Sequence, residues 1–161
     1  MSRRPPYVAV IGSGVADPER DAQAESVGRE LARRGAVLLC GGLGGVMDAS
    51  CRGAREAGGT TVGLLPGTDR AGASAHLAVA LPTGMGELRN GLIVRAADAV
   101  IAVGGEYGTL AEIGFALKLG RPVVGLGTWE LARHGRAVEA VVVAPDPARA
   151  VERALELSDG R

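Results

Sequence analysis

The residues whose types and spacing could do chemistry are concentrated in the run VGGEYGTLAE at positions 103–112. An apolar strand is expected immediately before it, at 99–102, and an apolar helix after it. A glycine-rich turn between a strand and a helix leaves unpaired N–H groups at the positive end of the helix dipole, where anions bind. Because Gly104, Gly105 and Gly108 carry no Cβ, the backbone can approach a phosphate closely. The run therefore predicts a phosphate site.

Two polar side chains follow the glycines on the predicted helix. Thr109 adds a hydroxyl donor, and Glu112 lies three residues further on, so both are expected on the same side of the helix. A carboxylate beside an anion site is unfavourable for binding alone, since like charges repel. The position of Glu112 therefore raises the question of catalysis.

The elements that must position these residues are short apolar runs alternating with segments of helical length. This alternation predicts an α/β fold of one domain over residues 1–161, a doubly wound, mainly parallel sheet with helices on both faces. Strands are expected at 7–11, 36–40, 61–65, 77–81, 99–103, 122–126 and 138–143. Helices are expected at 18–34, 46–57, 87–97, 109–119 and 147–157, with a short polar helix at 130–134 after Trp129.

Three glycine clusters follow three of the predicted strands, at 12–14, 41–45 and 104–108. In a 3-2-1-4-5 strand order these strands are neighbours around the switch point, where open α/β sheets bind ligands. Tight strand–helix turns would explain one such cluster, but three clusters at one crevice favour a ligand site. The expected ligand-binding residues are Gly12, Ser13, Gly14, Gly41, Gly42, Gly44, Gly45, Met47, Asn90, Gly104, Gly105, Tyr107, Gly108 and Thr109. For Met47 a core role is an equal alternative, and Tyr107 either stacks on a ligand or covers the loop.

The familiar nucleotide-binding motifs are incomplete. Asp17 stands where a dinucleotide fingerprint needs its third glycine, and the second strand ends in Cys40-Gly41 instead of a ribose-binding acid. Lys118 is the single lysine and lies on a predicted helix, which excludes a P-loop and disfavours pyridoxal-phosphate chemistry.

Composition narrows the partners further. The 18 basic and 18 acidic residues cancel, so no basic surplus favours nucleic acid. We expect no membrane span, because no run of about 18 apolar residues occurs, and no signal peptide, so the expected location is the cytoplasm. Cys40 and Cys51 form no paired motif and are expected to be reduced thiols, and two histidines are too few to indicate a metal site.

Three stretches resemble the lonely-guy (LOG) family of nucleotide phosphoribohydrolases, long misnamed lysine decarboxylases. Residues 40–48 are similar to its G-G-x-x-G-x-M segment, and residues 84–90 lie where it has M-H-E-R-K. Residues 104–112 match P-G-G-x-G-T-x-x-E, with Gly104 in place of the proline and Glu106 in place of the second glycine. The resemblance covers most of the chain and implies that Arg89 and Glu112 correspond to the family's proposed catalytic pair.

Two departures shift the resemblance to a neighbouring branch, which includes molybdenum-cofactor carrier proteins. Leu88 replaces an acid and Asn90 replaces a lysine of the family pattern. The branch implies binding of a phosphorylated nucleotide-like molecule, a nucleoside monophosphate or molybdenum cofactor, by a carrier or sensor that requires no cofactor. The alternative is a phosphoribohydrolase, not a lysine decarboxylase, which uses Arg89 and Glu112 to release free base and ribose 5-phosphate from a nucleoside 5′-monophosphate.

The helix at 110–119 is apolar nearly all round and must be buried. Because relatives of this type pair helices across the flank of the sheet, we expect a homodimer or homotetramer.

Overall fold

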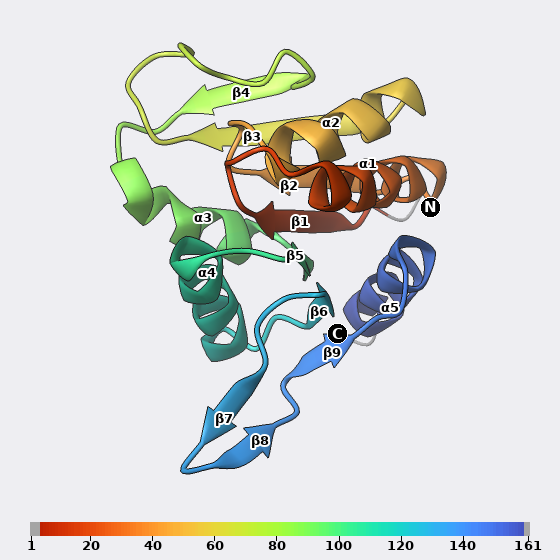
Figure 1. Ribbon diagram of the computed structural model, residues 1–161. Coiled ribbons are helices and arrows are strands. Elements are labelled where there is room, and N and C mark those ends of the chain that lie inside the picture. Colours follow the sequence, from red (N-terminus) through yellow and green to blue (C-terminus); the bar gives the residue numbers. More distant parts are fainter. Residues whose placement is uncertain (1–3, 160–161) are drawn as a thin grey trace.

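The apolar runs of the sequence become seven strands of one parallel sheet in the computed structural model, which describes residues 4–159. The strand order is β4-β3-β2-β1-β5-β6-β9 (Figure 1). Its strands are β1 (Tyr7–Gly12), β2 (Val37–Cys40), β3 (Thr60–Leu65), β4 (Val79–Pro82), β5 (Ala99–Val103), β6 (Val123–Leu126) and β9 (Val141–Val143). The α/β class is confirmed, and so is the central order predicted as 3-2-1-4-5, which corresponds to β3-β2-β1-β5-β6.

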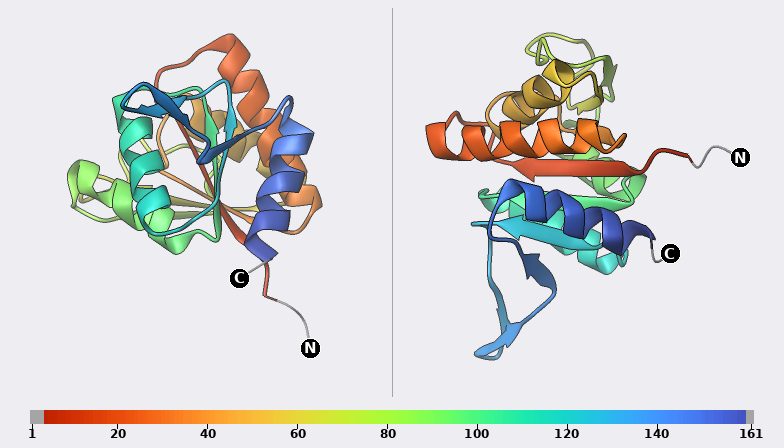
Figure 2. Two further views of the ribbon diagram at one scale, coloured as in Figure 1. Left: turned by 90° about the horizontal axis from the view of Figure 1, so that it is seen from below. Right: turned by 90° about the vertical axis from the view of Figure 1, so that its right-hand side faces the viewer.

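Helices cover both faces of the sheet (Figure 2). They are α1 (Pro18–Arg33), α2 (Val46–Glu56), α3 (Arg89–Ala96), α4 (Tyr107–Lys118) and α5 (Pro147–Asp159), with the 3-10 turn η1 (Gly86–Leu88) before α3. Apolar residues of α1, α2 and α5 pack with Val8 and Val10 in one core, whereas those of α3 and α4 pack with Ala9 and Ile11 in a second. Successive residues of β1 thus serve opposite faces, which explains its continuous apolar sequence.

Glycines bring α1 and α2 into close contact. A Cβ on Gly28 would lie 1.9 Å from the Ser50 carbonyl oxygen, and one on Gly53 would lie 2.0 Å from the Glu25 carbonyl oxygen. The two helix backbones approach at a distance that only glycine permits.

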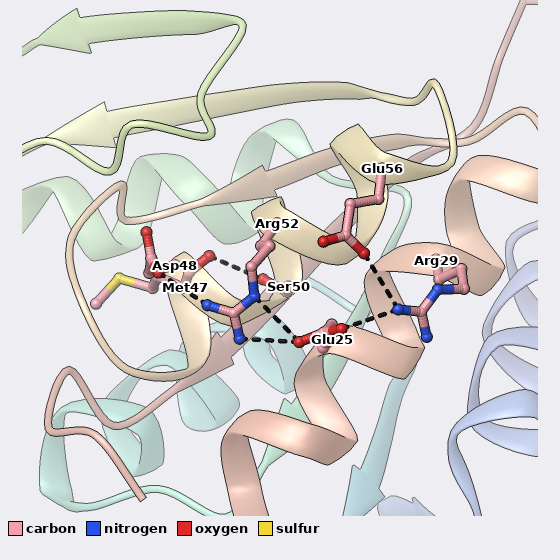
Figure 3. A network of polar contacts seen from close by, with 7 residues as sticks. All are labelled: Glu25, Arg29, Met47, Asp48, Ser50, Arg52 and Glu56. Atoms are coloured by element: carbon pink, nitrogen blue, oxygen red, sulfur yellow. Dashed lines mark hydrogen bonds and ion pairs between the residues drawn. The ribbon is translucent and has the colours of Figure 1, made fainter. Parts of the chain in front are cut away.

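Ion pairs join the outer sides of α1 and α2 (Figure 3). The Glu25 carboxylate lies 2.9 Å from the guanidinium of Arg52 and 2.8 Å from that of Arg29, and Arg29 reaches Glu56 at 3.3 Å. The arginine partners hold the pKa of Glu25 below its usual value. These groups are partly exposed, so the pairs add little stability beyond the glycine contact.

The helix expected at 130–134 is wrong. The segment forms an antiparallel hairpin of β7 (Leu131–Arg133) and β8 (Arg136–Val138), which projects from the sheet in Figure 1. His134 and Gly135 connect the strands with φ of 51° and 75°. Positive φ at both turn residues is the geometry of a two-residue hairpin loop, so local turn chemistry prevails over helix propensity.

Other boundaries also differ from those expected. The strand expected at 138–143 is divided between β8 and β9, and that expected at 77–81 is shifted to β4. The helix expected at 87–97 begins as the 3-10 turn η1. The helix expected to be buried nearly all round is buried on one side only within this chain, since Phe115 of α4 is 46% exposed.

Candidate functional site

Two adjoining hollows lie at the carboxyl ends of the central strands. The smaller has a volume of about 300 Å³ and is lined by Gly12, Ser13, Gly14, Val15, Gly41, Met47, Arg89, Asn90, Glu106, Gly108, Thr109 and Glu112. The larger, about 810 Å³, is lined by Leu43, Pro66, Glu87, Leu88, Arg89, Asn90, Gly91, Tyr107, Gly108, Ala111, Glu112 and Phe115. Four residues line both hollows: Arg89, Asn90, Gly108 and Glu112. We call these four the junction.

The smaller hollow brings together residues from all three glycine clusters, as the switch-point argument predicts. It meets the first turn of α4, whose N-cap residue Glu106 makes no side-chain capping hydrogen bond. The first N–H groups of an α-helix have no intrahelical acceptor. Together with the buried Thr109, the first turn of α4 therefore presents donors and a positive dipole end to this hollow.

Five of the predicted ligand-binding glycines line neither hollow and instead shape the loops. Gly42 and Gly45 have φ of 76° and 59°, and a Cβ on Gly45 would lie 2.3 Å from the Ser13 carbonyl oxygen. Gly105 has φ of 108°, and its Cβ would lie 2.4 Å from the side chain of Thr109. Gly44 and Gly104 complete the group.

Arg89 is a buried cation held by backbone oxygens. Its Nε donates to the Leu64 carbonyl at 2.8 Å, and its Nη2 donates to the Gly41 carbonyl at 3.3 Å. Its Nη1 donates to the side-chain oxygen of Asn90. Burial lowers the pKa of Arg89, while Glu112 opposes that shift, and an arginine still remains charged. The side chain is thus fixed at the junction by partners on β3, on the turn after β2 and on α3.

Glu112 is buried beside this cation without a partner of its own. It is 8% exposed, and burial raises the pKa of its carboxyl group to about 7, against the opposing effect of Arg89. Within residues 4–159, no hydrogen bond reaches the Glu112 carboxylate and no ion pair within 4.0 Å joins it to Arg89. The junction therefore holds a buried cation beside a buried carboxyl group, and the two are not hydrogen-bonded to each other.

A loop between β3 and β4 is bound to the glycine turn after β2. The Ser74 amide donates to the Gly42 carbonyl at 2.8 Å, and the Ser74 hydroxyl donates to Asp48 at 2.6 Å. A Cβ on Gly42 would lie 3.3 Å from Leu77 of the same loop. These contacts hold the glycine turn whose Gly41 carbonyl accepts from Arg89.

Sequence reasoning missed most of the larger hollow. Its lining residues Leu43, Pro66, Leu88 and Phe115 come from four separate segments, which no local motif connects. Their proximity depends on how α3 and α4 pack, and the exposure of Phe115 is visible only in the structure.

Cys40 and Cys51 are free and buried, with their sulfurs 3.5 Å apart. Across residues 4–159, no group of three or more His, Cys, Asp or Glu side chains is placed to hold a metal ion. In the same part of the chain, no helix has the length and apolarity needed to cross a bilayer.

The sequence matches a known protein family over most of its length. Residues 5–151 match the model of the SLOG cluster4 family, and the chain belongs to that family. This result confirms the resemblance seen in the motifs. An uncharacterized protein from Archaeoglobus fulgidus is 47% identical over 120 residues, which cover 74% of this chain and 78% of that protein.

Among solved structures, this chain is similar to proteins that bind or carry molybdenum cofactor. The molybdenum cofactor binding protein from Rippkaea orientalis is 35% identical, with a TM-score of 0.89 over 97% of this chain and 99% of that one. The Moco carrier protein from Chlamydomonas reinhardtii is 34% identical, with a TM-score of 0.85 over 98% of this chain and 100% of that one. DNA processing protein A from Helicobacter pylori, 19% identical with a TM-score of 0.72, shares the fold alone.

Proposed function

We propose that this protein binds a phosphorylated, nucleotide-like small molecule at the two hollows and acts as its carrier or sensor, with molybdenum cofactor as the favoured cargo. The observation that carries the proposal is the uncapped first turn of α4 in the smaller hollow, directly continuous with a larger hollow. Molybdopterin has one phosphate and one pterin ring system, which match a small anion site and a wider compartment. The similarity to molybdenum cofactor proteins supports this choice over a nucleoside monophosphate.

The proposed roles follow from position. Gly108 and Thr109 at the start of α4 donate to the phosphate, with Ser13 on the facing loop. Arg89 and Asn90 contact the part of the ligand that passes through the junction. Gly14 leaves the backbone accessible to the phosphate, whereas Gly12 is required by packing, since a Cβ there would lie 2.6 Å from the Val103 carbonyl oxygen.

The test is direct transfer of the cofactor. Molybdenum cofactor released from a molybdoenzyme is mixed with the protein under anaerobic conditions, and the pterin is measured in gel-filtration fractions after oxidation to its fluorescent form. We expect the pterin to co-elute with the protein and to be lost with Thr109→Val, which removes the hydroxyl and keeps the side-chain shape. Glu139→Gln, at an exposed residue outside both hollows, serves as the control. Pterin found in the small-molecule fractions with the unaltered protein would contradict the proposal.

One observation favours a second function, a nucleoside 5′-monophosphate phosphoribohydrolase. The buried Glu112 carboxyl group, with a pKa of about 7, exists in both protonation states near neutral pH. Its neutral form can protonate a departing base, and its anion can stabilise an oxocarbenium-like sugar. Arg89 would orient the ribose 5-phosphate at the junction.

Free-base release from a panel of nucleoside 5′-monophosphates, followed by chromatography, distinguishes the two functions. Base release that disappears in Glu112→Ala would establish the hydrolase. An absence of release, together with cofactor binding, supports the carrier.

We further propose that the protein works as a homodimer or homotetramer in the cytoplasm. Leu92 of α3 leaves 38% of its surface exposed and lines neither hollow, and a second copy packed against the outer side of α3 would bury it. The two free thiols fit a reducing compartment. Sedimentation at micromolar concentration that shows only a 16.3 kDa species would contradict the assembly.

A further inference from the structure

The larger hollow contains two of the four aromatic side chains of this chain. The sequence contains one Trp, two Tyr and one Phe. Tyr107 and Phe115 both line the larger hollow, although they are 78% and 46% exposed. Core packing does not account for aromatic rings left so open in a protein whose cores are built from aliphatic residues. Their common location needs another reason.

Each of the two rings has a neighbour on the protein side. Trp129 packs against Tyr107 with ring centroids 5.8 Å apart, and its indole N–H donates to the Glu106 carbonyl at 3.3 Å. Phe115 lies over Gly91, where an ideal Cβ would be 3.7 Å from the ring. An aromatic side chain has only two side-chain torsions, so it loses little entropy when a planar ligand stacks on it.

The remaining walls fit the same kind of occupant. Leu43, Pro66 and Ala111 offer apolar contact, and the 810 Å³ volume falls within the usual range of small-molecule sites. The hollow joins the phosphate site through the junction, so a ligand anchored by its phosphate would place its ring system here.

Glu87 gives the larger hollow a hydrogen-bond acceptor, which favours a ligand with donors on its ring edge. It lies in η1 at the exposed rim, and within residues 4–159 no hydrogen bond or ion pair engages its carboxylate. A carboxylate presents two acceptor oxygens that match two adjacent N–H donors. A 2-amino-4-oxo ring, as in pterin or guanine, has such an edge, whereas adenine places each donor beside an acceptor.

We propose that the larger hollow is a stacking subsite for a planar ring with two adjacent N–H donors, in which Tyr107 and Phe115 contact the ring faces and Glu87 accepts from its edge. The proposal rests on the proposed function, because it uses the same phosphate anchor. It goes further by assigning the ring class, two residues that stack on the ring and one, Glu87, that discriminates its edge.

Calorimetric titration with ribose 5-phosphate, AMP and GMP tests this directly, and chromatography confirms that each nucleotide is recovered intact. Ribose 5-phosphate measures the phosphate site alone, AMP adds stacking, and GMP adds the donor edge. We expect AMP to bind roughly tenfold more tightly than ribose 5-phosphate, and GMP roughly tenfold more tightly than AMP.

Two variants separate the contributions. Phe115→Leu keeps the apolar volume and removes the ring, so it should weaken both nucleotides several-fold and leave ribose 5-phosphate unchanged. Glu87→Gln should bring GMP within about threefold of AMP. Glu130→Gln, also exposed but outside the hollow, is the matched control and should change none of the three.

The outcomes are distinct. If ribose 5-phosphate binds as tightly as both nucleotides, the stacking subsite is wrong and the phosphate site stands. If none of the three ligands binds, the phosphate anchor of the proposed function fails as well. If Phe115→Leu lowers the sedimentation mass without changing nucleotide affinity, the hollow is an interface between copies, and the subsite is overturned.

Discussion

Replacing Glu112 with Gln should make the protein more stable at alkaline pH and change the pH dependence of its folding. Glu112 is the buried carboxyl group at the junction, and burial raises its pKa from 4.5 to about 7. A raised carboxyl pKa means that folding favours the protonated form. Its favourable contribution is therefore fully present below the unfolded value near 4.5 and is lost as pH rises through about 7. Gln keeps the shape of the protonated side chain and does not titrate.

The size of the effect follows from the pKa difference between the folded and unfolded states. Each pKa unit corresponds to about 1.4 kcal/mol, so this group should remove about 2 to 3 kcal/mol of unfolding free energy between pH 5 and pH 8. The stability of Glu112→Gln relative to the parent protein should rise by that amount over the same interval. For a chain of this length, the corresponding increase in Tm difference is roughly 5–10 °C.

The assay is urea unfolding followed by circular dichroism at pH 5, 6, 7 and 8, without ligand. Glu139→Gln, an exposed residue on the turn after β8, is the matched control and should follow the parent protein. The unfolding free energy of each variant is compared with that of the parent at the same pH. This comparison cancels the effect of Glu25, whose lowered pKa makes stability rise with pH. Parallel pH profiles for Glu112→Gln and the parent would refute the reasoning, as would a variant less stable than the parent at pH 8.

Three further outcomes are expected. Gly28→Ala should destabilise the protein by about 1–3 kcal/mol in urea unfolding, because its Cβ would lie 1.9 Å from a backbone oxygen, whereas Gly114→Ala on α4 meets open space and should be neutral or slightly stabilising. Asp17→Ala removes the N-cap bond to the Arg20 amide at 2.9 Å and should cost about 1 kcal/mol in the same assay, so an unchanged midpoint would contradict the capping role. Arg89→Met should weaken ribose 5-phosphate binding at least tenfold by calorimetry, since it removes the buried cation, and unchanged affinity would exclude Arg89 from the site.

The fold could be predicted because its central strands are buried on both faces. Apolar runs such as 99–103 have no amphipathic alternation, so strand, class and order follow from the alternation with helices. The hairpin β7–β8 could not be predicted, because its strands are three residues long and its turn has only two residues. His134-Gly135 is a two-residue turn in which only the glycine favours positive φ.

Part of the candidate site could also be predicted from the sequence, and part could not. The loops at 12–14 and 104–109 follow strands directly, so their meeting at one edge is set by topology and could be anticipated. The burial of Arg89 could not be anticipated, because a charge in the first turn of a helix is more often solvated. Its acceptors are the Leu64 and Gly41 carbonyls on other elements, and their approach depends on tertiary packing.

Gly104 shows how a departure from a motif is accommodated. The backbone there has φ of 55°, which proline, fixed near −65°, does not adopt. The space that a Cβ would occupy is taken by Arg20, whose Cδ and Nε lie 3.0 Å from that position. Arg20 Nη1 donates to the Gly127 carbonyl at 2.9 Å, and the Thr128 hydroxyl donates to the Gly104 carbonyl at 2.5 Å.

The loop before α4 is thus held from two sides, by the start of α1 and by the segment after β6. These contacts restrict the backbone at Gly104, as the ring of a proline would. They leave the first turn of α4 without a side-chain cap. The second departure, Glu106, fits the same arrangement. Its backbone is extended, with φ of −105° and ψ of −161°, and its carbonyl accepts from the Trp129 indole, so the residue needs no glycine conformation. The two substitutions change how the loop is held, and the first turn of α4 still opens into the smaller hollow without a side-chain cap.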